Sequence, residues 1–566
     1  MAPPRVGSGR KRALHSKART GCITCRIRRV KCDEAKPACK RCINFGTDCD
    51  GYIGVSEEPR PSAGGRGMLV PILPKSQKLI STSEIESIDR YSPFVDGLEL
   101  HFFQVYLEET ATQIAGPCRT SLWNRLIPQA SEAHPFIRNA IIAIGAISKT
   151  SDNDLRLPLS NSVIERHQLA EQRRYALKHY GKALNGMRRA IENGVQDMRF
   201  ILLGCLLAFC FETLEGRQGP ACNLAIGGLA LFYDQFGTCA DPSKPSPKAP
   251  IPLEIDLVDA FASLDIQALF FLDLRPLRLH QHVIDESSQA LAVMPSRFYD
   301  LEQARICWRI MMRRNFHFKC KAQAIGKAAE LGVAKTPSGW DEIADFSAGS
   351  VPFSKVKEPS HQIIIESQEY IGDIYRWLAA ASHIFESIPP SDQASTQTAT
   401  LLQIHAKMNI IALASMSFDS ETSFDTFLPE FRSITTMVSV IYLDIIAASQ
   451  NNSMYRFDLG ILPPLFLVAS RCRHRSIRGR AIDMLMSNPY REGIWDSIIV
   501  GNISIWLRNI EEAGLSSDWR VIPENKRVFL TAADLDLYHQ RAKVFCTQRR
   551  GPRDEDLVFM EDTLTW

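Results

Sequence analysis

The stretch that decides the fold of the N-terminal region is residues 20–49, which read TGCITCRIRRVKCDEAKPACKRCINFGTDC. Six of the chain's fifteen cysteines fall here in two C-x2-C-x6-C runs, the second lying 17 residues after the first. They are Cys22, Cys25, Cys32, Cys39, Cys42 and Cys49. Two cysteines separated by two residues present both sulfurs on one side of a turn, as a tetrahedral metal ion requires. The spacing therefore predicts a metal site built from thiolates.

The number of sulfurs sets the form of this site. A structural zinc ion takes four ligands, so six cysteines fill two sites only if two sulfurs bridge both ions. The internal repeat suggests that the bridging pair is symmetry-related, which leaves Cys22 with Cys39, Cys25 with Cys42, or Cys32 with Cys49. The segment is too short and polar to fold on a hydrophobic core, so metal binding should drive its folding.

Two other interpretations of the cysteines are less favoured. A disulfide knot needs an oxidising compartment, and residues 1–19 have no apolar stretch of the kind that a signal peptide carries. A RING-type site needs eight ligands, and the cluster contains no histidine. Zinc bound by six thiolates is therefore the preferred hypothesis.

The basic residues of the segment are unevenly divided between its halves. The first half has RIRRVK between its second and third cysteines, whereas the second half has INFGTD at the matching place. A short helix tied to zinc would present Arg26, Arg28, Arg29 and Lys31 from a rigid element. Such cations suit phosphate contacts and bidentate reading of guanine in the major groove. A merely solvated basic face is the alternative.

These residues carry a resemblance to a known family. The six cysteines, the run RIRRVKCD and the Lys36-Pro37 pair before Cys39 resemble the Zn(II)2Cys6 binuclear cluster of fungal transcription regulators. The resemblance implies that Cys22 and Cys39 bridge the two zinc ions. It also implies that Arg28 and Arg29, at the end of the first short helix, read CGG triplets. Lysine is usual in the family where this chain has Arg29.

The rest of the chain is long and differs in charge. At 566 residues it should hold at least one further large domain, and its hydrophobic fraction of 45% is normal for a globular protein. Residues 1–50 carry a net charge of +9, whereas the remainder carries −6. We interpret residues 1–20 as a disordered basic arm in which GRKR could act in nuclear import or contact phosphates. The longest apolar run, residues 201–211, is too short to cross a membrane, so no membrane partner is expected.

The pattern changes twice after the cluster, which occupies 21–50. Residues 51–83 are rich in Gly and Pro and predict a flexible linker without the heptads of a coiled coil. From 84 to 515 apolar residues recur with helical spacing, which predicts a large all-α domain and hence a mainly α chain. The clearest helices are expected at 164–192, 300–332, 361–388, 396–417, 423–449 and 495–513.

The large domain also resembles the helical regulatory domain of fungal cluster proteins, most clearly at 463–497. Within this stretch, the arginines of 471–480 could form a second nucleic-acid patch, but a solvated or ion-paired face is favoured. In the C-terminal segment, 516–566, the tail DEDLVFMEDTLTW suits either an acidic activation tail or a terminal strand packed on the domain.

The sequence therefore predicts a nuclear regulator of RNA polymerase II transcription that binds double-stranded DNA through two zinc ions. Its partners would include coactivators or other transcription machinery, with homodimers forming through the helical domain. The resemblance implies control of one pathway, in secondary metabolism or nutrient use. No catalytic motif is found, so an enzyme with a zinc appendage has no support. The remaining alternative is a zinc-cluster adaptor for proteins, or a repressor without a direct activation role.

Overall fold

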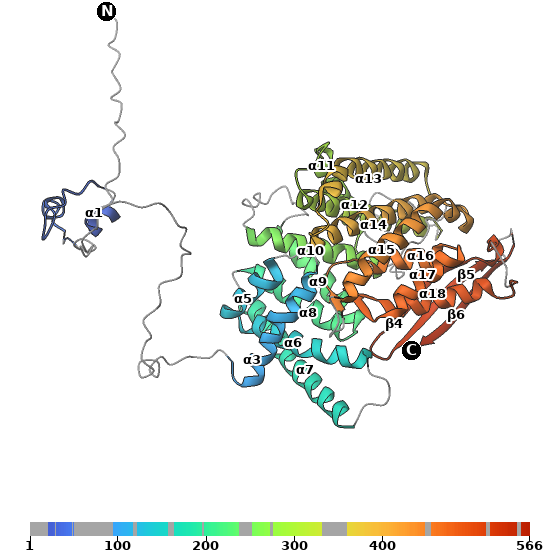
Figure 1. The fold of residues 1–566 in the computed structure, drawn as a ribbon, viewed down its shortest axis with the longest axis horizontal. Helices are drawn as coiled ribbons and strands as arrows, with labels where there is room; N and C mark the ends of the chain where they lie inside the picture. The colour runs from blue at the N-terminus through green and yellow to red at the C-terminus, as the bar shows by residue number, and fades with distance from the viewer. Residues whose placement is uncertain are drawn as a thin grey trace, which may run out of the picture. The chain divides into compact units, whose positions relative to one another are not determined.

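The computed structural model describes residues 21–49 except 29 and 48, then 94–116, 121–156, 163–194, 197–236, 252–271, 275–330, 359–447, 454–516, 521–551 and 556–566. The chain divides into two compact units, Met1–Arg90 and Tyr91–Trp566. The predicted basic arm and the predicted linker at 51–83 lie outside the described residues. Figure 1 shows the helices of the larger unit and the small sheets near its C-terminus.

In the first unit, the described residues form two short helices, α1 (Ile23–Ile27) and α2 (Lys40–Ile43). In the described residues of this unit, the cysteines form the only core. All of them except Cys49 are buried. No aliphatic or aromatic core supports the segment there. This fits the prediction that a metal must supply the folding energy.

The first half of the large unit packs around one hydrophobic core. Its elements run from α3 to α10: α3 (Gly97–Val105), η1 (Tyr106–Thr110), α4 (Ala111–Ala115), η2 (Leu122–Leu126), α5 (Ile127–Ala133), α6 (Pro135–Arg156), α7 (Val163–Glu192), α8 (Met198–Leu214), α9 (Gln218–Phe236) and α10 (Pro252–Phe271). Every residue of α8 from Ile201 to Leu214 is buried, since residues 201–211 are apolar on all sides and the buried Glu212 accepts from the hydroxyl of Tyr180. Helices α3 and α6 cross closely at Gly145, where a Cβ would lie 2.1 Å from the carbonyl oxygen of Phe102.

The second half forms a second core, to which α10 also contributes. Its helices are α11 (Leu277–Ala292), α12 (Leu301–Glu330), α13 (His361–Ser387), α14 (Gln393–Ala414), η4 (Ser415–Ser417), η5 (Glu421–Phe427), α15 (Leu428–Ala447), α16 (Leu462–Arg471), α17 (Arg475–Ser487), α18 (Ser497–Glu512) and η6 (Glu524–Lys526). The six helices expected most clearly from the sequence are confirmed as α7, α12, α13, α14, α15 and α18. The mainly α fold is thus confirmed.

Two three-stranded sheets were not predicted, so the large domain is helical but not all-α. The smaller sheet pairs β1 (Met454–Arg456) in parallel with β2 (Tyr490–Glu492), and β2 antiparallel with β3 (Trp495–Asp496). The larger sheet is an antiparallel meander of β4 (Val528–Asp536), β5 (Arg541–Arg549) and β6 (Leu557–Thr565). Of the two structures considered for the tail, residues 557–565 have that of a terminal strand.

Within the stretch that resembles the family's regulatory domain, Glu492 stabilises the start of helix α16. Its buried carboxylate accepts hydrogen bonds from the backbone N–H groups of Gly460, Ile461 and Leu462, at 2.8, 2.7 and 3.0 Å. Prolines follow at the start of α16 and have no N–H to satisfy. The carboxylate therefore satisfies the free donors at this helix start and also interacts favourably with the helix dipole.

The arginines of 471–480 are divided between the core and the surface. Arg471, Arg473 and Arg478 are buried, and they pair with Glu421 and Glu511 in a group that we name the C-terminal charge network. The ion-paired alternative is therefore correct for these three, and the solvated alternative is wrong for them. The acids lie 38 and 52 residues from Arg473, so the sequence pattern around 471–480 could not show them.

A second buried polar group lies between α10 and α12. The carboxylate of Asp265 pairs with Arg275, accepts from the Nε of Arg313 at 2.7 Å, and lies 3.0 Å from the Nε2 of His317. The hydroxyl of Tyr233 also donates to it at 2.6 Å. Burial alone would raise the pKa of Asp265, but its cationic neighbours outweigh this effect and hold the pKa well below its ordinary value.

Candidate metal centre and nucleic-acid interface

The six cysteines predicted as ligands are brought together in two groups of four. One group contains Cys22, Cys25, Cys32 and Cys39, and the other contains Cys22, Cys39, Cys42 and Cys49. Within each group the sulfurs lie within 4.8 Å of one another, and both groups contain Cys22 and Cys39. This is the sharing that the family resemblance implies, among the three pairs that spacing alone left open.

The distances between sulfurs suit zinc. The Sγ atoms of Cys22 and Cys39 are 3.6 Å apart, and those of Cys25 and Cys39 are 3.7 Å apart. A tetrahedral zinc ion with bonds of about 2.3 Å to sulfur places its ligands about 3.8 Å from each other. The cluster thus has the dimensions of thiolate ligands gathered around ions of this size.

The backbone repeats the symmetry of the sequence. The N–H of Cys22 donates to the Sγ of Cys32 at 3.4 Å, and 17 residues later the N–H of Cys39 donates to the Sγ of Cys49 at 3.5 Å. Likewise, the N–H of Cys25 donates to Cys22 and that of Cys42 donates to Cys39, both at 3.4 Å. Such donors stabilise negative sulfur, so both halves are built to hold thiolates.

Burial acts against the thiolate form unless a cation is present. Desolvation raises the pKa of Cys22 to about 12, and it also raises the pKa values of Cys25 and Cys39. Six close thiolates would repel one another, whereas divalent ions among them would offset both costs. The donor set is soft and the sulfurs are close, which fits zinc better than an oxygen-seeking ion such as magnesium.

Asp33 fixes the second half of the cluster to the first. Its carboxylate accepts from the backbone N–H groups of Lys40 and Arg41, both at 3.1 Å, at the start of α2. Desolvation would raise the pKa of Asp33, but the two amides outweigh it and lower the pKa. The sequence offered a signal here, because this aspartate directly follows the third cysteine in RIRRVKCD.

The predicted DNA-contacting residues lie in and just after α1. The backbone N–H of Arg28 donates to the carbonyl of Thr24 at 3.1 Å, which extends the helical turn beyond Ile27. Lys31 is exposed. The side chain of Arg26 and the whole of Arg29 lie outside the described residues. Of the four predicted contacts, Arg28 and Lys31 are therefore the ones that the structure places.

Arg28 makes a contact that the sequence did not predict. Its guanidinium carbon lies 3.4 Å from the centre of the Phe45 ring, in the second half of the cluster. Phe45 is 64% exposed, so the stacked pair lies at the surface of the unit. The matching position in the first half is Arg28 itself, 17 residues earlier, so the repeat pairs a cation with a ring. Only this complementarity between INFGTD and RIRRVK could have suggested the contact.

In the parts of the chain that the structure describes, no helix is long and apolar enough to cross a membrane. The described cysteines outside the cluster are all free thiols. These are Cys205, Cys210, Cys222, Cys307, Cys320, Cys472 and Cys546.

Comparisons with known proteins agree with this geometry. Residues 20–56 match the fungal Zn(2)-Cys(6) binuclear cluster domain. The chain is 25% identical to the aspercryptin biosynthesis cluster-specific transcription regulator atnN of Emericella nidulans, over 92% of each protein. It is also 25% identical to the transcription regulator lscL of Purpureocillium lilacinum, over 38% of this chain and 48% of that protein.

A third relative matches only a short stretch of the chain. The sterol uptake control protein 2 of Saccharomyces cerevisiae is 54% identical over 39 residues, which is 7% of this chain and 4% of that protein. No solved structure matches the chain. The match to atnN covers 92% of the chain, so the likeness extends over most of the helical domain. The chain therefore carries an N-terminal fungal Zn(2)-Cys(6) binuclear cluster domain, and over most of its length it is similar to a fungal transcription regulator.

Proposed function

We propose that this protein is a nuclear, sequence-specific regulator of RNA polymerase II transcription that recognises CGG-type sites in double-stranded DNA. The observation that carries the proposal is the pair of four-sulfur groups sharing Cys22 and Cys39, next to a strongly basic stretch. Each group would hold one zinc ion, so the cluster would bind two. The ions are closed off by thiolates and serve folding, and no catalytic reaction is assigned to them.

The DNA contacts follow from the position of the basic residues. Arg28, whose backbone N–H continues the first helical turn, and Arg29, the next residue in the sequence, would form bidentate hydrogen bonds to guanine O6 and N7 in the major groove. Arg26 and Lys31 would contact phosphates and set the orientation of the cluster on the duplex. The second half of the cluster braces this arrangement through the shared sulfurs and through Asp33.

The biological role is proposed from the relatives. The name of atnN says that it is specific to one biosynthetic gene cluster. We infer a similarly narrow role for this chain, with control of one pathway of secondary metabolism or nutrient use. The helical domain would form homodimers and meet coactivators. A zinc-cluster adaptor for proteins, or a repressor without a direct activation role, is the alternative.

The test of metal binding uses the full-length protein and two substitutions. Metal analysis of the wild-type protein should give two zinc ions per chain. Cys39→Ser removes one ligand from both groups and should abolish tight zinc binding, whereas Cys307→Ser, at a partly buried thiol of α12, should leave two ions bound. A Cys39→Ser protein that still holds two ions would contradict the shared-ligand assignment.

The test of DNA recognition compares CGG-containing duplexes with scrambled ones by fluorescence anisotropy. Removing the hydrogen bonds to one guanine should cost about 1–3 kcal/mol, so Arg28→Ala and Arg29→Ala should each weaken specific binding about 5- to 150-fold. Lys31→Ala should instead weaken binding to all duplexes alike and reduce the salt dependence by about one phosphate contact.

Arg41→Ala is the matched control for loss of one positive charge, because Arg41 is exposed on α2 in the second half. Its affinity for the CGG duplex should change far less than that of Arg28→Ala. If the zinc-loaded wild type binds CGG and scrambled duplexes equally, sequence recognition by the cluster is refuted. If it binds no duplex at all, the adaptor alternative gains support.

A further inference from the structure

A cavity lies in the large unit where its two hydrophobic cores meet. Its volume is about 90 Å³, and its walls come from the end of α4, from α10, α12 and α14, and from the segment that leaves β1. Residues of that segment belong to both cores, since Phe457 packs in the first and Ile461 in the second. A molecule bound there would contact both halves of the regulatory domain.

One part of the wall is apolar. Ile266 projects from α10, Trp308 and Met312 from α12, and Leu401 and Leu402 from α14. Of these, Trp308, Met312, Ile266 and Leu402 belong to the buried core, while Leu401 is only partly buried against it. This part of the cavity suits the apolar body of a ligand, as is usual for small-molecule sites.

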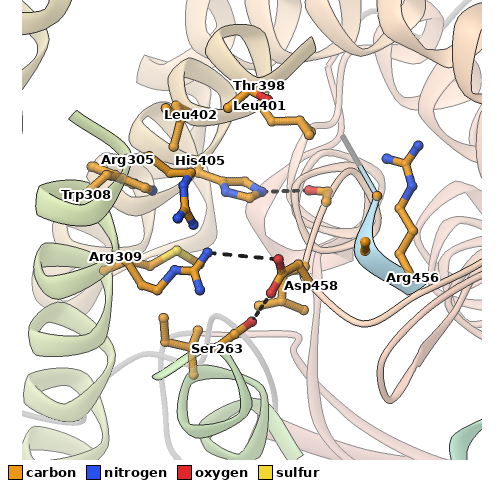
Figure 2. A pocket seen from close by; sticks show the side chains of 16 residues that line it. Ser263, Arg305, Trp308, Arg309, Thr398, Leu401, Leu402, His405, Arg456 and Asp458 are labelled. Carbon is orange, nitrogen blue, oxygen red and sulfur yellow. Dashed lines mark hydrogen bonds and ion pairs between the residues drawn. The ribbon is translucent and has the colours of Figure 1, made fainter. Parts of the chain in front are cut away.

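Most charged groups on the wall already have partners. Asp458 accepts from the hydroxyl of Ser263 and lies 3.9 Å from Arg309, which faces it in Figure 2. Arg309 also pairs with Asp259 at 2.7 Å. The remaining arginine on this side, Arg305, is held by Glu302 at 2.6 Å and by Asp259 at 3.1 Å. Each of these charged groups thus already has a partner of opposite charge within the protein.

Arg456 differs from the other two arginines. It is only 9% exposed, it lines the cavity, and it forms no ion pair with any carboxylate among the described residues. Glu492 is its register partner on β2, but that carboxylate accepts three backbone N–H groups at the start of α16. A buried guanidinium without a direct carboxylate partner is costly, and an anion beside it would offset that cost.

His405 adds a hydrogen-bond acceptor to the same cavity. Its Nε2 lies 2.7 Å from the carbonyl oxygen of Gly460, a contact that Figure 2 marks with a dashed line. A carbonyl oxygen can only accept, so Nε2 carries the hydrogen and donates. Burial lowers the pKa of His405, which keeps the ring neutral near pH 7. The Nδ1 atom is then an acceptor, and no hydrogen bond to it is found in the described part of the chain.

We propose that this cavity binds a small organic monocarboxylate, with its carboxylate on Arg456, its apolar body against Trp308 and Leu402, and a hydroxyl or N–H donating to Nδ1 of His405. The cavity, with a volume of about 90 Å³, has room for at least a four-carbon acid. This ligand site does not depend on the proposed DNA recognition, since all of its residues lie in the helical domain.

The test uses the zinc-loaded full-length protein and three probes of nearly equal size. Isobutyrate carries the carboxylate, isobutyramide replaces it by a neutral amide, and 3-hydroxyisobutyrate adds a hydroxyl donor. Isothermal titration calorimetry should show that isobutyrate binds at least tenfold more tightly than the amide. The carboxylate would form a hydrogen bond with the guanidinium of Arg456 in which both partners are charged, whereas the amide is neutral. The hydroxy acid should bind more tightly than isobutyrate.

Two variants locate the binding. Arg456→Gln should bring the affinity for isobutyrate down to that for the amide, while Arg432→Gln, at an exposed arginine of α15, should leave the tenfold preference unchanged. Leu401→Trp should fill the cavity and abolish binding of all three probes. If Arg456→Gln fails to fold, the acid-to-amide ratio of the wild type and the result for Leu401→Trp still decide.

Three results would overturn the proposal. The first is equal affinity of the wild type for the acid and the amide, and the second is acid binding that survives Leu401→Trp. The third is that neither isobutyrate nor its hydroxy derivative binds at 10 mM, a concentration that corresponds to a binding free energy of about 3 kcal/mol.

Discussion

Replacing Glu511 by glutamine should loosen the C-terminal sheet selectively. The buried carboxylate of Glu511 accepts from Arg473 at 2.8 Å and from Arg478 at 2.7 Å, and it also accepts from the backbone N–H of Val528 at 2.9 Å, where β4 begins. Glutamine keeps the shape of the side chain but removes its charge. The three buried arginines of the C-terminal charge network would then share one acid, Glu421, in place of two.

The expected loss follows from the burial of the partners. The side chains of Glu511, Arg473 and Arg478 are 0%, 2% and 1% exposed, so water cannot screen or replace the missing charge. Breaking a buried pair of this kind costs about 3–5 kcal/mol, whereas domains are typically stable by only about 5–15 kcal/mol. The unfolding free energy of the region around β4 should fall by a large fraction of its total.

The assay is hydrogen–deuterium exchange resolved by peptide. Peptides from β4 and β5 should exchange about two to three and a half powers of ten faster in Glu511→Gln, since about 1.4 kcal/mol corresponds to a factor of ten. Peptides from α6, in the first core, should keep their rates. The control is Glu512→Gln, the next residue of α18, which is only partly buried and has no comparable ion pair in the described region. Equal exchange from β4 in wild type and Glu511→Gln would refute the reasoning.

Three further predictions rest on other contacts. Gly145→Ala should lower the melting temperature measured by differential scanning fluorimetry, because its Cβ would overlap a carbonyl oxygen of α3, whereas Gly219→Ala, where nothing lies within 4 Å, should not lower it. Phe45→Ala removes the stack on Arg28, which is worth about 0.5–1 kcal/mol, and should weaken binding to a CGG duplex about two- to fivefold. The zinc content should not change. An unchanged affinity for the duplex would show that the ring has no role in recognition. The pKa of Asp265 is lowered on folding, so its ionised carboxylate stabilises the fold at neutral pH and this stabilisation disappears as the pH falls below about 4. Urea titrations at several pH values should show that Asp265→Asn abolishes this part of the acid sensitivity. A pH profile of unfolding free energy that is the same in the variant and the wild type would contradict the prediction.

The sequence predicted the cluster well because its geometry is encoded locally. Successive cysteines have only two or six residues between them, so short local turns bring them together. The 17-residue repeat of cysteines also reappears in the structure as a repeat of N–H···S contacts from Cys22 and Cys39. The long helices were equally accessible, since each is defined by apolar residues on its own face. Both kinds of prediction depend on residues that are close in the chain.

The features that the sequence missed depend on partners far along the chain. The basic run at 471–480 gave no sign that its arginines are buried, because Glu421 and Glu511 become neighbours only through folding. Strand β4, VFLTAADLD, does not alternate clearly between apolar and polar residues, and a register shift after Leu530 interrupts its pairing. Arg456 shows the same limit, since its isolation from acids is a property of the assembled core.

The two shared sulfurs make the two halves of the cluster depend on each other. Each half repeats the cysteine spacing of the other, yet each contributes only three thiols to its own group of four and takes the fourth from the other half. A peptide that contained one half alone would be one ligand short of a tetrahedron. Duplication could create such a motif, but neither copy could afterwards be deleted, exchanged or redesigned by itself. The smallest stretch that could hold either ion is therefore the one that contains both halves, the 28 residues from Cys22 to Cys49 or most of them.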